Sequence, residues 1–173
     1  PIFDDEGSYS IGCVTIDPNN PNIIWVGTGE DLGGRHFGYG DGIYRSEDGG
    51  NTWVNMGLKN SEHISKIVIH PNDSNIIWVA SQGPLWSKGG ERGVYKSTDG
   101  GANFTSLDHA GKNYFGYTSD ASDDKGQAPR DMDIIVNPSN AEDVHIAGVL
   151  SWRSTNGGTD FTVTSQWQPG PAA

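Results

Sequence analysis

The stretch GIYRSEDGGNTW, residues 42–53, decides the fold of this chain because related copies of it follow twice. The later copies read GVYKSTDGGANF at 93–104 and LSWRSTNGGTDF at 150–161. Each joins a short apolar run to a serine, a nearby Asp or Asn, a pair of glycines and a terminal aromatic residue. The copies recur about every 50 residues, a period typical of β-propeller blades, in which each repeat is a small sheet that cannot bury its faces alone.

A second repeated element precedes each copy. It reads GCVTIDPNNPNIIWVGTG at 12–29, SKIVIHPNDSNIIWVASQ at 65–82 and MDIIVNPSNAEDVHIAGV at 132–149. In each, an apolar, β-rich run leads to a turn that contains proline and then to a second apolar run. The missing N–H of proline costs nothing there, because the strand ladder has already ended. The two elements together predict four antiparallel strands in every repeat.

The predicted fold class is therefore all-β, a β-propeller with three four-stranded antiparallel blades. The first strands are expected at 9–17, 63–70 and 131–137, the second at 22–28, 75–81 and 143–149, the third at 42–46, 93–97 and 150–154, and the fourth from Trp53, Phe104 and Phe161 onward. The corresponding segments are blade 1 at 1–58, blade 2 at 59–107, a long inter-blade loop at 108–130, blade 3 at 131–168 and a tail at 169–173.

The pattern S-x-D-x-G-x-T-W resembles the Asp-box, or BNR, motif of sialidases, sortilin-type receptors and family-74 glucanases. The carboxylates of Asp48 and Asp99 are expected to accept backbone N–H groups within the turn, while the glycines adopt positive φ angles. In Asp-box families the motif lies away from the active centre, so the resemblance implies a structural role. The residues concerned are Ser46, Asp48, Gly50, Trp53, Ser97, Asp99, Gly101, Phe104, Ser154, Asn156, Gly158 and Phe161.

Longer strings within residues 2–104 resemble the start of a bacterial sortilin/Vps10-type Asp-box protein. They are IFDDEGSYSIGCVTIDPNNPNIIWVGTGE, YGDGIYRSEDGGNTWVNMGL, HISKIVIHPNDSNIIWVASQGPLW and ERGVYKSTDGG. Such proteins are exported, multi-bladed propellers that are grouped loosely with glycosyl hydrolases, so the resemblance implies a secreted or cell-surface location. The last blade is similar to surface proteins of gliding or type IX-secreting bacteria, whereas the segment 107–130 has no counterpart in the sortilin-like family.

The composition of the chain limits the classes of partner that it can bind. The net charge of −11, with only 11 Lys and Arg residues, argues against nucleic acid, because phosphate binding needs clustered cations. No apolar run approaches the roughly 20 residues that span a bilayer.

The single cysteine, Cys13, is expected to be a small buried apolar residue. Since the chain begins at Pro1 and shows three blades, we expect it to be a processed or excised part of a larger propeller, with remaining blades or another subunit as partners.

The long connections at 29–41, 82–92 and 107–130 are all predicted on the side of the blades opposite the short turns. Long loops on one side of a rigid scaffold commonly bind ligands. The predicted function is an extracellular or cell-surface module that binds protein or glycan through this side; plain surface decoration is the alternative reading of the loops. The candidate binding residues are Arg35, His36, Tyr39, Trp86, Arg92, Tyr114 and Tyr117.

An enzyme remains the alternative, although the sequence leans against one. Glycoside hydrolysis uses two carboxylates about 5–10 Å apart, and Glu30 and Asp41 are candidates by their place in the first long loop. The arginines lack the context expected of a sialidase triad, so the alternative is a non-sialidase, glucanase-like hydrolase segment.

No cofactor is predicted apart from a candidate calcium site. Asp120, Asp123 and Asp124 supply hard oxygen ligands close together, but they lack the spacing of an EF-hand loop, and a solvated acidic loop is the favoured reading. The histidines show no spacing typical of a zinc site.

Overall fold

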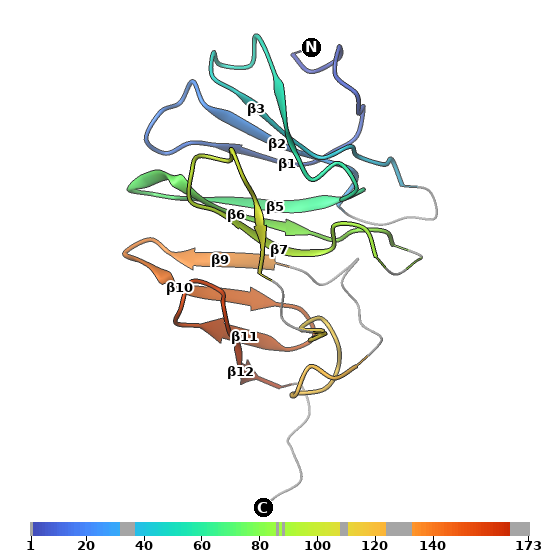
Figure 1. Ribbon diagram of the computed structural model, residues 1–173, viewed down its shortest axis with the longest axis vertical. Helices are drawn as coiled ribbons and strands as arrows, with labels where there is room; N and C mark the ends of the chain where they lie inside the picture. The colour runs from blue at the N-terminus through green and yellow to red at the C-terminus, as the bar shows by residue number, and fades with distance from the viewer. Residues whose placement is uncertain are drawn as a thin grey trace, which may run out of the picture. The chain divides into compact units, whose positions relative to one another are not determined.

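The computed structural model describes residues 2–31, 37–85, 87, 89–107, 111–123 and 133–166. Its twelve strands form three four-stranded antiparallel sheets, each a simple meander, and the described residues contain no helix (Figure 1). The all-β fold with three four-stranded blades is thus confirmed. No segment of the described chain is a helix able to cross a membrane.

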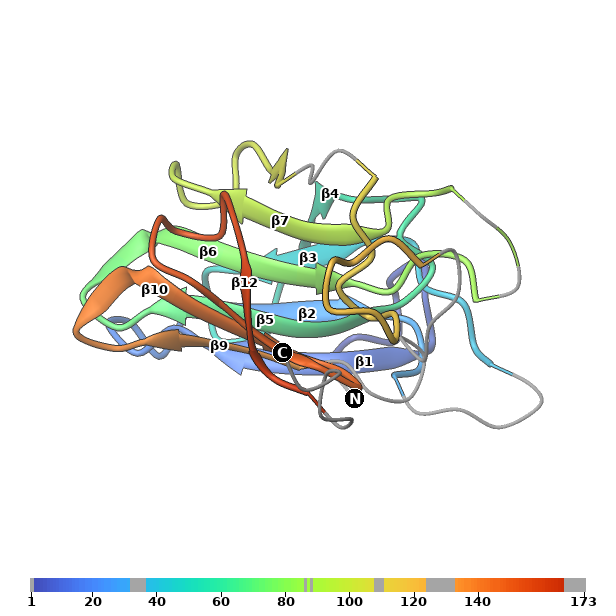
Figure 2. The same ribbon diagram turned by 90° about the horizontal axis from the view of Figure 1, so that it is seen from below.

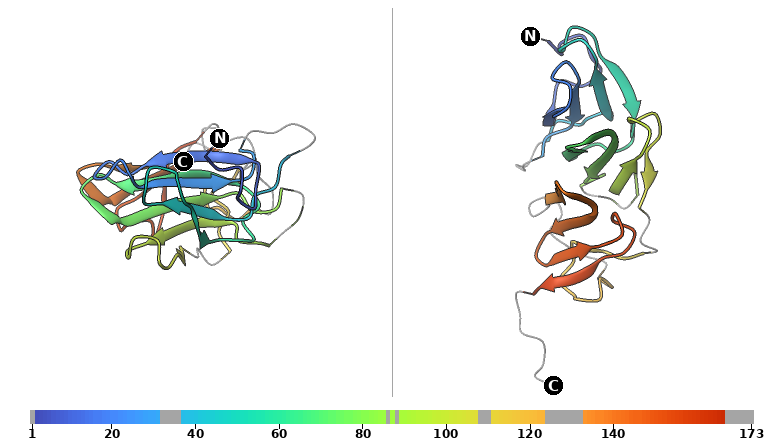
Figure 3. Two further views of the ribbon diagram at one scale, coloured as in Figure 1. Left: turned by 90° about the horizontal axis from the view of Figure 1, so that it is seen from above. Right: turned by 90° about the vertical axis from the view of Figure 1, so that its left-hand side faces the viewer.

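The strands fall within a few residues of the predicted positions. Blade 1 consists of β1 (Ile11–Ile16), β2 (Ile24–Thr28), β3 (Ile43–Ser46) and β4 (Val54–Gly57); blade 2 of β5 (Ile64–His70), β6 (Asp73–Ser81), β7 (Gly93–Ser97) and β8 (Thr105–Ser106); and blade 3 of β9 (Asp133–Asn137), β10 (Asn140–Ala147), β11 (Ser151–Ser154) and β12 (Thr162–Ser165). The meander of each blade can be followed by colour in Figure 3.

Blades 1 and 2 form one compact unit, Pro1–Leu107. Strand β5 lies beside β1 and β2, as Figures 1 and 2 show. The Thr15 hydroxyl donates a hydrogen bond to the Ile67 carbonyl across this junction, at 2.9 Å. The core of the unit is one cluster from both blades, comprising Trp25, Ile43, Leu58, Ile64, Ile67, Ile69, Ile77, Val79 and Tyr95.

The register of blade 1 divides its side chains between two faces. Thr15 pairs with Trp25, and Trp25 with Arg45, so these three residues share the face that meets blade 2. Val14, Val26 and Tyr44 are paired in the same way one residue further along. Because successive side chains of a strand point to opposite faces, this second set faces away from blade 2.

Blade 3 and the segment before it form a second unit, Asp108–Ala173. The described part of that segment, 111–123, packs on blade 3. The Trp152 indole N–H donates to the Tyr114 carbonyl at 2.8 Å, and the Tyr114 ring lies against Trp152 and Phe161. Much of the predicted inter-blade loop therefore belongs to the unit of blade 3.

Candidate binding site on the long-loop side

The three repeated turns, here called the Ser–Asx turns, are residues 46–53, 97–104 and 154–161. In the first, the Ser46 hydroxyl donates to Asp48 Oδ1 at 2.8 Å and accepts the Gly50 N–H at 2.8 Å. The Asp48 carboxylate also accepts the N–H groups of Asn51 and Thr52 and the Thr52 hydroxyl. These hydrogen bonds, first those from Thr52, hold the pKa of Asp48 at about 2.

The other two turns repeat this network with different side chains. In blade 2 the Asn103 amide donates to Asp99 Oδ2 at 2.8 Å. In blade 3 the types are exchanged, and the Asn156 amide donates to Asp160 Oδ2 at 3.2 Å. Both turns keep the serine bridge, from Ser97 at 2.8 Å and from Ser154 at 2.8 Å. One amide and one carboxylate satisfy each other in either order, so the third copy is chemically equivalent to the second.

Each Ser–Asx turn is tied to the neighbouring turn of its own blade. The N–H groups of Gly49, Gly100 and Gly157 donate to the carbonyls of Asn22, Asn75 and Glu142, at 2.9, 3.1 and 2.9 Å. The serine and Asx groups are thus engaged in holding short turns together at one side of each blade. Ligand chemistry in this chain is better sought on the opposite side.

On that opposite side, the loop between β2 and β3 is closed at its base. The Thr28 hydroxyl donates to the Gly42 carbonyl at 2.6 Å and accepts the Asp41 N–H at 2.9 Å. The Glu30 N–H donates to the Gly38 carbonyl at 3.0 Å, and the Gly38 N–H returns to Glu30 Oε2 at 2.8 Å. Glu30, one of the two catalytic candidates, therefore uses one carboxylate oxygen to close its own loop.

Asp41, the second candidate, lies where this loop enters β3. Its Oδ2 accepts the Tyr44 hydroxyl at 2.7 Å, and its carbonyl accepts the Asn55 amide at 3.0 Å. Its Oδ1 is buried and has no hydrogen-bond partner among the described residues. The backbone at Gly7 approaches the carboxylate so closely that a Cβ atom there would lie 2.2 Å from Oδ2.

His63 lies beneath the same loop and is fully buried. Its Nδ1 lies 3.0 Å from the Glu30 carbonyl, and its ring contacts Phe37 and Tyr39 with centroids 5.7 Å away in both cases. A carbonyl only accepts, so Nδ1 carries the proton. Burial lowers the pKa of His63, which leaves the imidazole neutral. Its Nε2 is then a hydrogen-bond acceptor, without a partner in the described part of the chain.

Gln82 lies opposite His63, just beyond the end of β6. Its N–H donates to the His63 carbonyl at 2.9 Å, and its side-chain amide donates to Asp31 Oδ1 at 3.1 Å. Its Oε1 and the hydroxyls of Ser61 and Ser81 are buried, again with no partner among residues that the structure describes. We call Ser61, His63, Ser81 and Gln82 the buried polar cluster. Native proteins leave few buried polar groups unpaired. Four groups in this cluster that are unpaired within the described chain therefore indicate a place where a further hydrogen-bonding group could be bound.

The second long loop holds itself together through Arg92 and Glu91. The Arg92 guanidinium donates to the carbonyls of Pro84 and Ser87, and burial lowers its pKa. Glu91 accepts the Asn60 N–H at 2.7 Å and donates its own N–H to the Asn60 carbonyl at 3.1 Å. Arg92, predicted to bind ligand, is thus used within its own loop.

In the second unit, one of the predicted binding residues packs on blade 3 and the other is exposed to solvent. Tyr114 is half-buried against blade 3, and burial raises its pKa. Tyr117 is exposed. The Asp123 carboxylate accepts the N–H groups of Tyr117 and Thr118, and hydrogen bonds, first those from Ser122, hold the pKa of Asp120 at about 2. Asp124 is outside the described residues, which contain no group of three acidic, His or Cys side chains able to hold a metal ion.

Arg35, His36 and Trp86 also lie outside the described residues. Tyr39 is exposed beside the buried polar cluster, and its ring contacts His63. Sequence reasoning overlooked His63 and Gln82. The available signal was a polar residue directly before β5 and another directly after β6, which antiparallel pairing brings together at the long-loop end of the hairpin.

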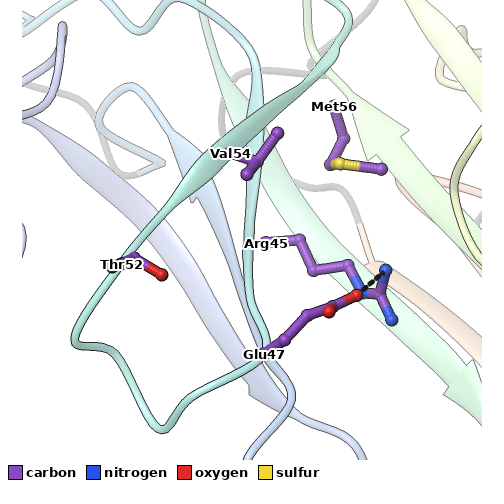
Figure 4. A pocket seen from close by; sticks show the side chains of 5 residues that line it. All are labelled: Arg45, Glu47, Thr52, Val54 and Met56. Carbon is purple, nitrogen blue, oxygen red and sulfur yellow. Dashed lines mark ion pairs between the residues drawn. The ribbon is translucent and has the colours of Figure 1, made fainter.

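Two hollows lie at equivalent places beside the third and fourth strands of blades 1 and 3. The first, about 250 Å³, is lined by Arg45, Glu47, Thr52, Val54 and Met56 (Figure 4). The second, about 300 Å³, is lined by Arg153, Thr155, Asn156, Asp160, Thr162 and Thr164. In each the arginine forms an ion pair within its own blade, Arg45 with Glu47 at 2.7 Å and Arg153 with Asp143 at 2.7 Å, although Arg45 Nε is buried without a hydrogen-bond partner among the described residues.

No protein-family model matches the chain, and no curated protein matches it in sequence. Solved structures match its fold. A GH74 enzyme from Niastella koreensis is 21% identical with a TM-score of 0.58, covering 89% of this chain and 22% of that one. A GH74 xyloglucanase from Xanthomonas campestris is 14% identical with a TM-score of 0.62, covering 96% and 25%. YCF48 from Cyanidioschyzon merolae is 15% identical with a TM-score of 0.59, covering 91% and 38%.

The chain therefore spans between 22% and 38% of the length of these three structures. At such identities the likeness concerns the fold alone. Together with the three meander sheets, it defines this chain as a β-propeller protein.

Proposed function

We propose that the chain is part of a glycan-binding propeller whose ligand is held on the long-loop side of blades 1 and 2. The observation that carries the proposal is the buried polar cluster next to the exposed Tyr39, whose ring contacts His63. His63 Nε2 and Gln82 Oε1 are acceptors in need of a donor, and the two serine hydroxyls can both donate and accept. Sugar hydroxyl groups match this mixture, and because the cluster is buried, the proposal requires the residues that cover it to move aside when the glycan binds.

Aromatic side chains beside the cluster support the same ligand class. Tyr39 is 60% exposed and Tyr9 is 92% exposed. Both belong to this side, since the Tyr39 carbonyl accepts the Ser8 hydroxyl at 3.1 Å and a Cβ atom at Gly38 would lie 3.5 Å from the Tyr9 ring. Exposed aromatic rings next to a few polar groups are typical of ligand sites. The net charge of −11 favours a neutral glycan over an anionic one.

The proposal also includes a family and a location for the chain. We take the Ser–Asx turns to be Asp-boxes and the chain to be a sortilin-like propeller that acts outside the cytoplasm, secreted or at the cell surface. Support comes from the sequence resemblance and from the extracellular role that glycan binding implies. The remaining blades of the propeller, or another subunit, are its proposed structural partners.

Titration of neutral and anionic polysaccharides tests the proposal. Xyloglucan and a mixed-linkage glucan would be compared with polygalacturonate, using affinity electrophoresis and calorimetry. Gln82→Ala and Tyr39→Ala are expected to weaken binding of the neutral glycan at least about 10-fold, the equivalent of about 1.4 kcal/mol. Val54→Ala, an exposed change on β4, is the matched control. Equal affinity in all variants, or capture of a protein ligand with no glycan bound, would overturn it.

A second candidate is a glycoside hydrolase segment with Glu30 and Asp41 as acid and base. It is favoured by the buried, unpaired Oδ1 of Asp41 within the described chain and by the description of two fold neighbours as GH74 enzymes. Reducing-sugar release by wild type, Glu30→Gln and Asp41→Asn tests it. Release that both substitutions abolish would support the hydrolase, whereas glycan binding without release would leave only the binding function.

A further inference from the structure

Ile2 and Phe3 occupy a socket on the face of blade 1 that points away from blade 2. The Phe3 ring meets Tyr44 and Trp53 edge to face, with centroids 5.1 Å apart in both pairs. The Trp53 indole N–H donates to the Ile2 carbonyl at 2.6 Å. A Cβ atom at Gly50 would lie 2.9 Å from Ile2 Cδ1, so the side chain of Ile2 rests on the glycine.

Blade 2 has the same socket at the corresponding positions of its repeat, and it is filled by blade 1. Tyr95 belongs to the core cluster that contains Trp25. The Phe104 ring meets Trp25 edge to face at 6.4 Å, and a Cβ atom at Gly101 would lie 2.2 Å from the Trp25 ring. A tyrosine, a glycine and an aromatic residue thus receive the second-strand tryptophan of the neighbouring blade.

The two sockets differ in what fills them. In blade 2 the occupant is a tryptophan from another sheet; in blade 1 it is the segment Ile2–Phe3, which is not part of any strand. The aromatic contact is edge to face in both, with interplanar angles of 82° and 86°. We infer that Phe3 holds in cis the place of a neighbouring blade's tryptophan, and that this flank of blade 1 is a docking surface for a second-strand tryptophan of another blade.

The surroundings of the socket fit such a partner. Val14 and Ile16, on the same face of β1, are 60% and 57% exposed. They extend the apolar surface toward the first strand, as Ile67 and Ile69 of β5 do in blade 2, where both belong to the core cluster shared with blade 1. Because Phe3 and the incoming indole require the same space, docking displaces the segment Ile2–Phe3. The segment therefore protects an apolar flank until another blade arrives.

Emptying the socket tests this inference, with N-acetyl-tryptophan amide as the probe. In Phe3→Ala the probe is expected to bind saturably and to shift the Trp53 indole N–H resonance, because an apolar cavity left by a deleted ring accepts a ring of similar size. The wild-type protein should show no such shift, and N-acetyl-leucine amide should have little effect on either protein. Tyr9→Ala, which removes an exposed ring six residues after Phe3 and outside the socket, is the matched control.

A substitution series keeps the inference testable if Phe3→Ala is poorly folded. Melting temperatures should fall in the order Phe3→Trp, wild type, Phe3→Leu, with the leucine variant roughly 3–5 °C below wild type. The inference is overturned if leucine matches phenylalanine, since the socket would then not select an aromatic ring. It is also overturned if the probe binds wild type and Phe3→Ala alike, or binds a folded Phe3→Ala protein not at all.

Discussion

Gly101, in the Ser–Asx turn of blade 2, lies directly against the indole of Trp25 in blade 1. A Cβ atom at Gly101 would approach Trp25 Cη2 to 2.2 Å, closer than any real contact allows. Trp25 is only 1% exposed, and its ring also packs edge to face against Phe104 of blade 2. The close packing of blades 1 and 2 therefore requires a residue without a side chain at position 101.

Gly101→Ala is expected to lower the free energy of unfolding by about 3 kcal/mol. The new methyl group must displace a buried indole, and the residue has a φ of +87°, which alanine adopts with strain. Chemical denaturation measures the effect. The control is Gly100→Ala in the same turn, where φ is +70° but the nearest atom is 3.4 Å away, so only the strain of about 1 kcal/mol is expected. Equal losses in the two variants would contradict the steric argument.

The exchanged pair Asn156 and Asp160 predicts that the cost of a substitution at one position depends on the residue at the other. Asn156→Asp alone places two carboxylates where an amide now donates to a carboxylate at 3.2 Å, and should cost about 1 kcal/mol. Adding Asp160→Asn recreates the arrangement of Asp99 and Asn103 and should restore most of the loss. A double-mutant cycle by thermal unfolding gives the coupling. Additive effects would show that the two side chains do not interact.

His63 predicts a loss of stability in mild acid. Burial lowers its pKa below the ordinary 6.5, so the unfolded chain binds the proton more readily than the folded one. Its contribution is complete above about pH 6.5 and is lost as the pH falls through the window between 6.5 and the folded pKa. Melting temperatures between pH 5 and 8 measure this, with the charges of Glu30 and Glu62 nearby opposing the shift.

His63→Gln should flatten that profile, because glutamine can still donate to the Glu30 carbonyl but does not titrate. His70→Gln, at the last residue of β5, is the matched control for replacing a histidine with glutamine. A wild-type profile that is already flat from pH 8 to 5 would be inconsistent with a buried neutral imidazole.

Cys13 is half-buried and packed against the core cluster of blades 1 and 2, and it is expected to react slowly with thiol reagents in the folded protein. Burial, the largest effect, raises its pKa from 9.0 to about 12, which reduces the thiolate fraction about 1000-fold at a given pH. Labelling with a disulfide reagent at pH 8 should therefore follow unfolding, and the labelling rate should rise with added urea. Rapid labelling in the absence of denaturant would mean that the junction of blades 1 and 2 opens readily.

The sequence alone was enough to predict the three blades, their strands within a few residues and the side of the Ser–Asx turns. Those features are local: Asp48 accepts N–H groups from residues three and four positions away, and glycine supplies the positive φ angles wherever the copy occurs. A repeat states such information several times, so one degenerate copy, with Asn156 for Asp, does not hide it.

Tertiary structure decided which polar groups lose contact with water and which rings meet. Tyr114 was a ligand candidate by its loop, yet it packs on Trp152; His63 was considered only as one of the histidines without zinc-site spacing, yet it belongs to the buried polar cluster. The contact of Phe3 with Trp53 joins positions far apart in the chain. Burial and such contacts depend on how sheets stack, and strand periodicity carries no information about the neighbour that a face will meet.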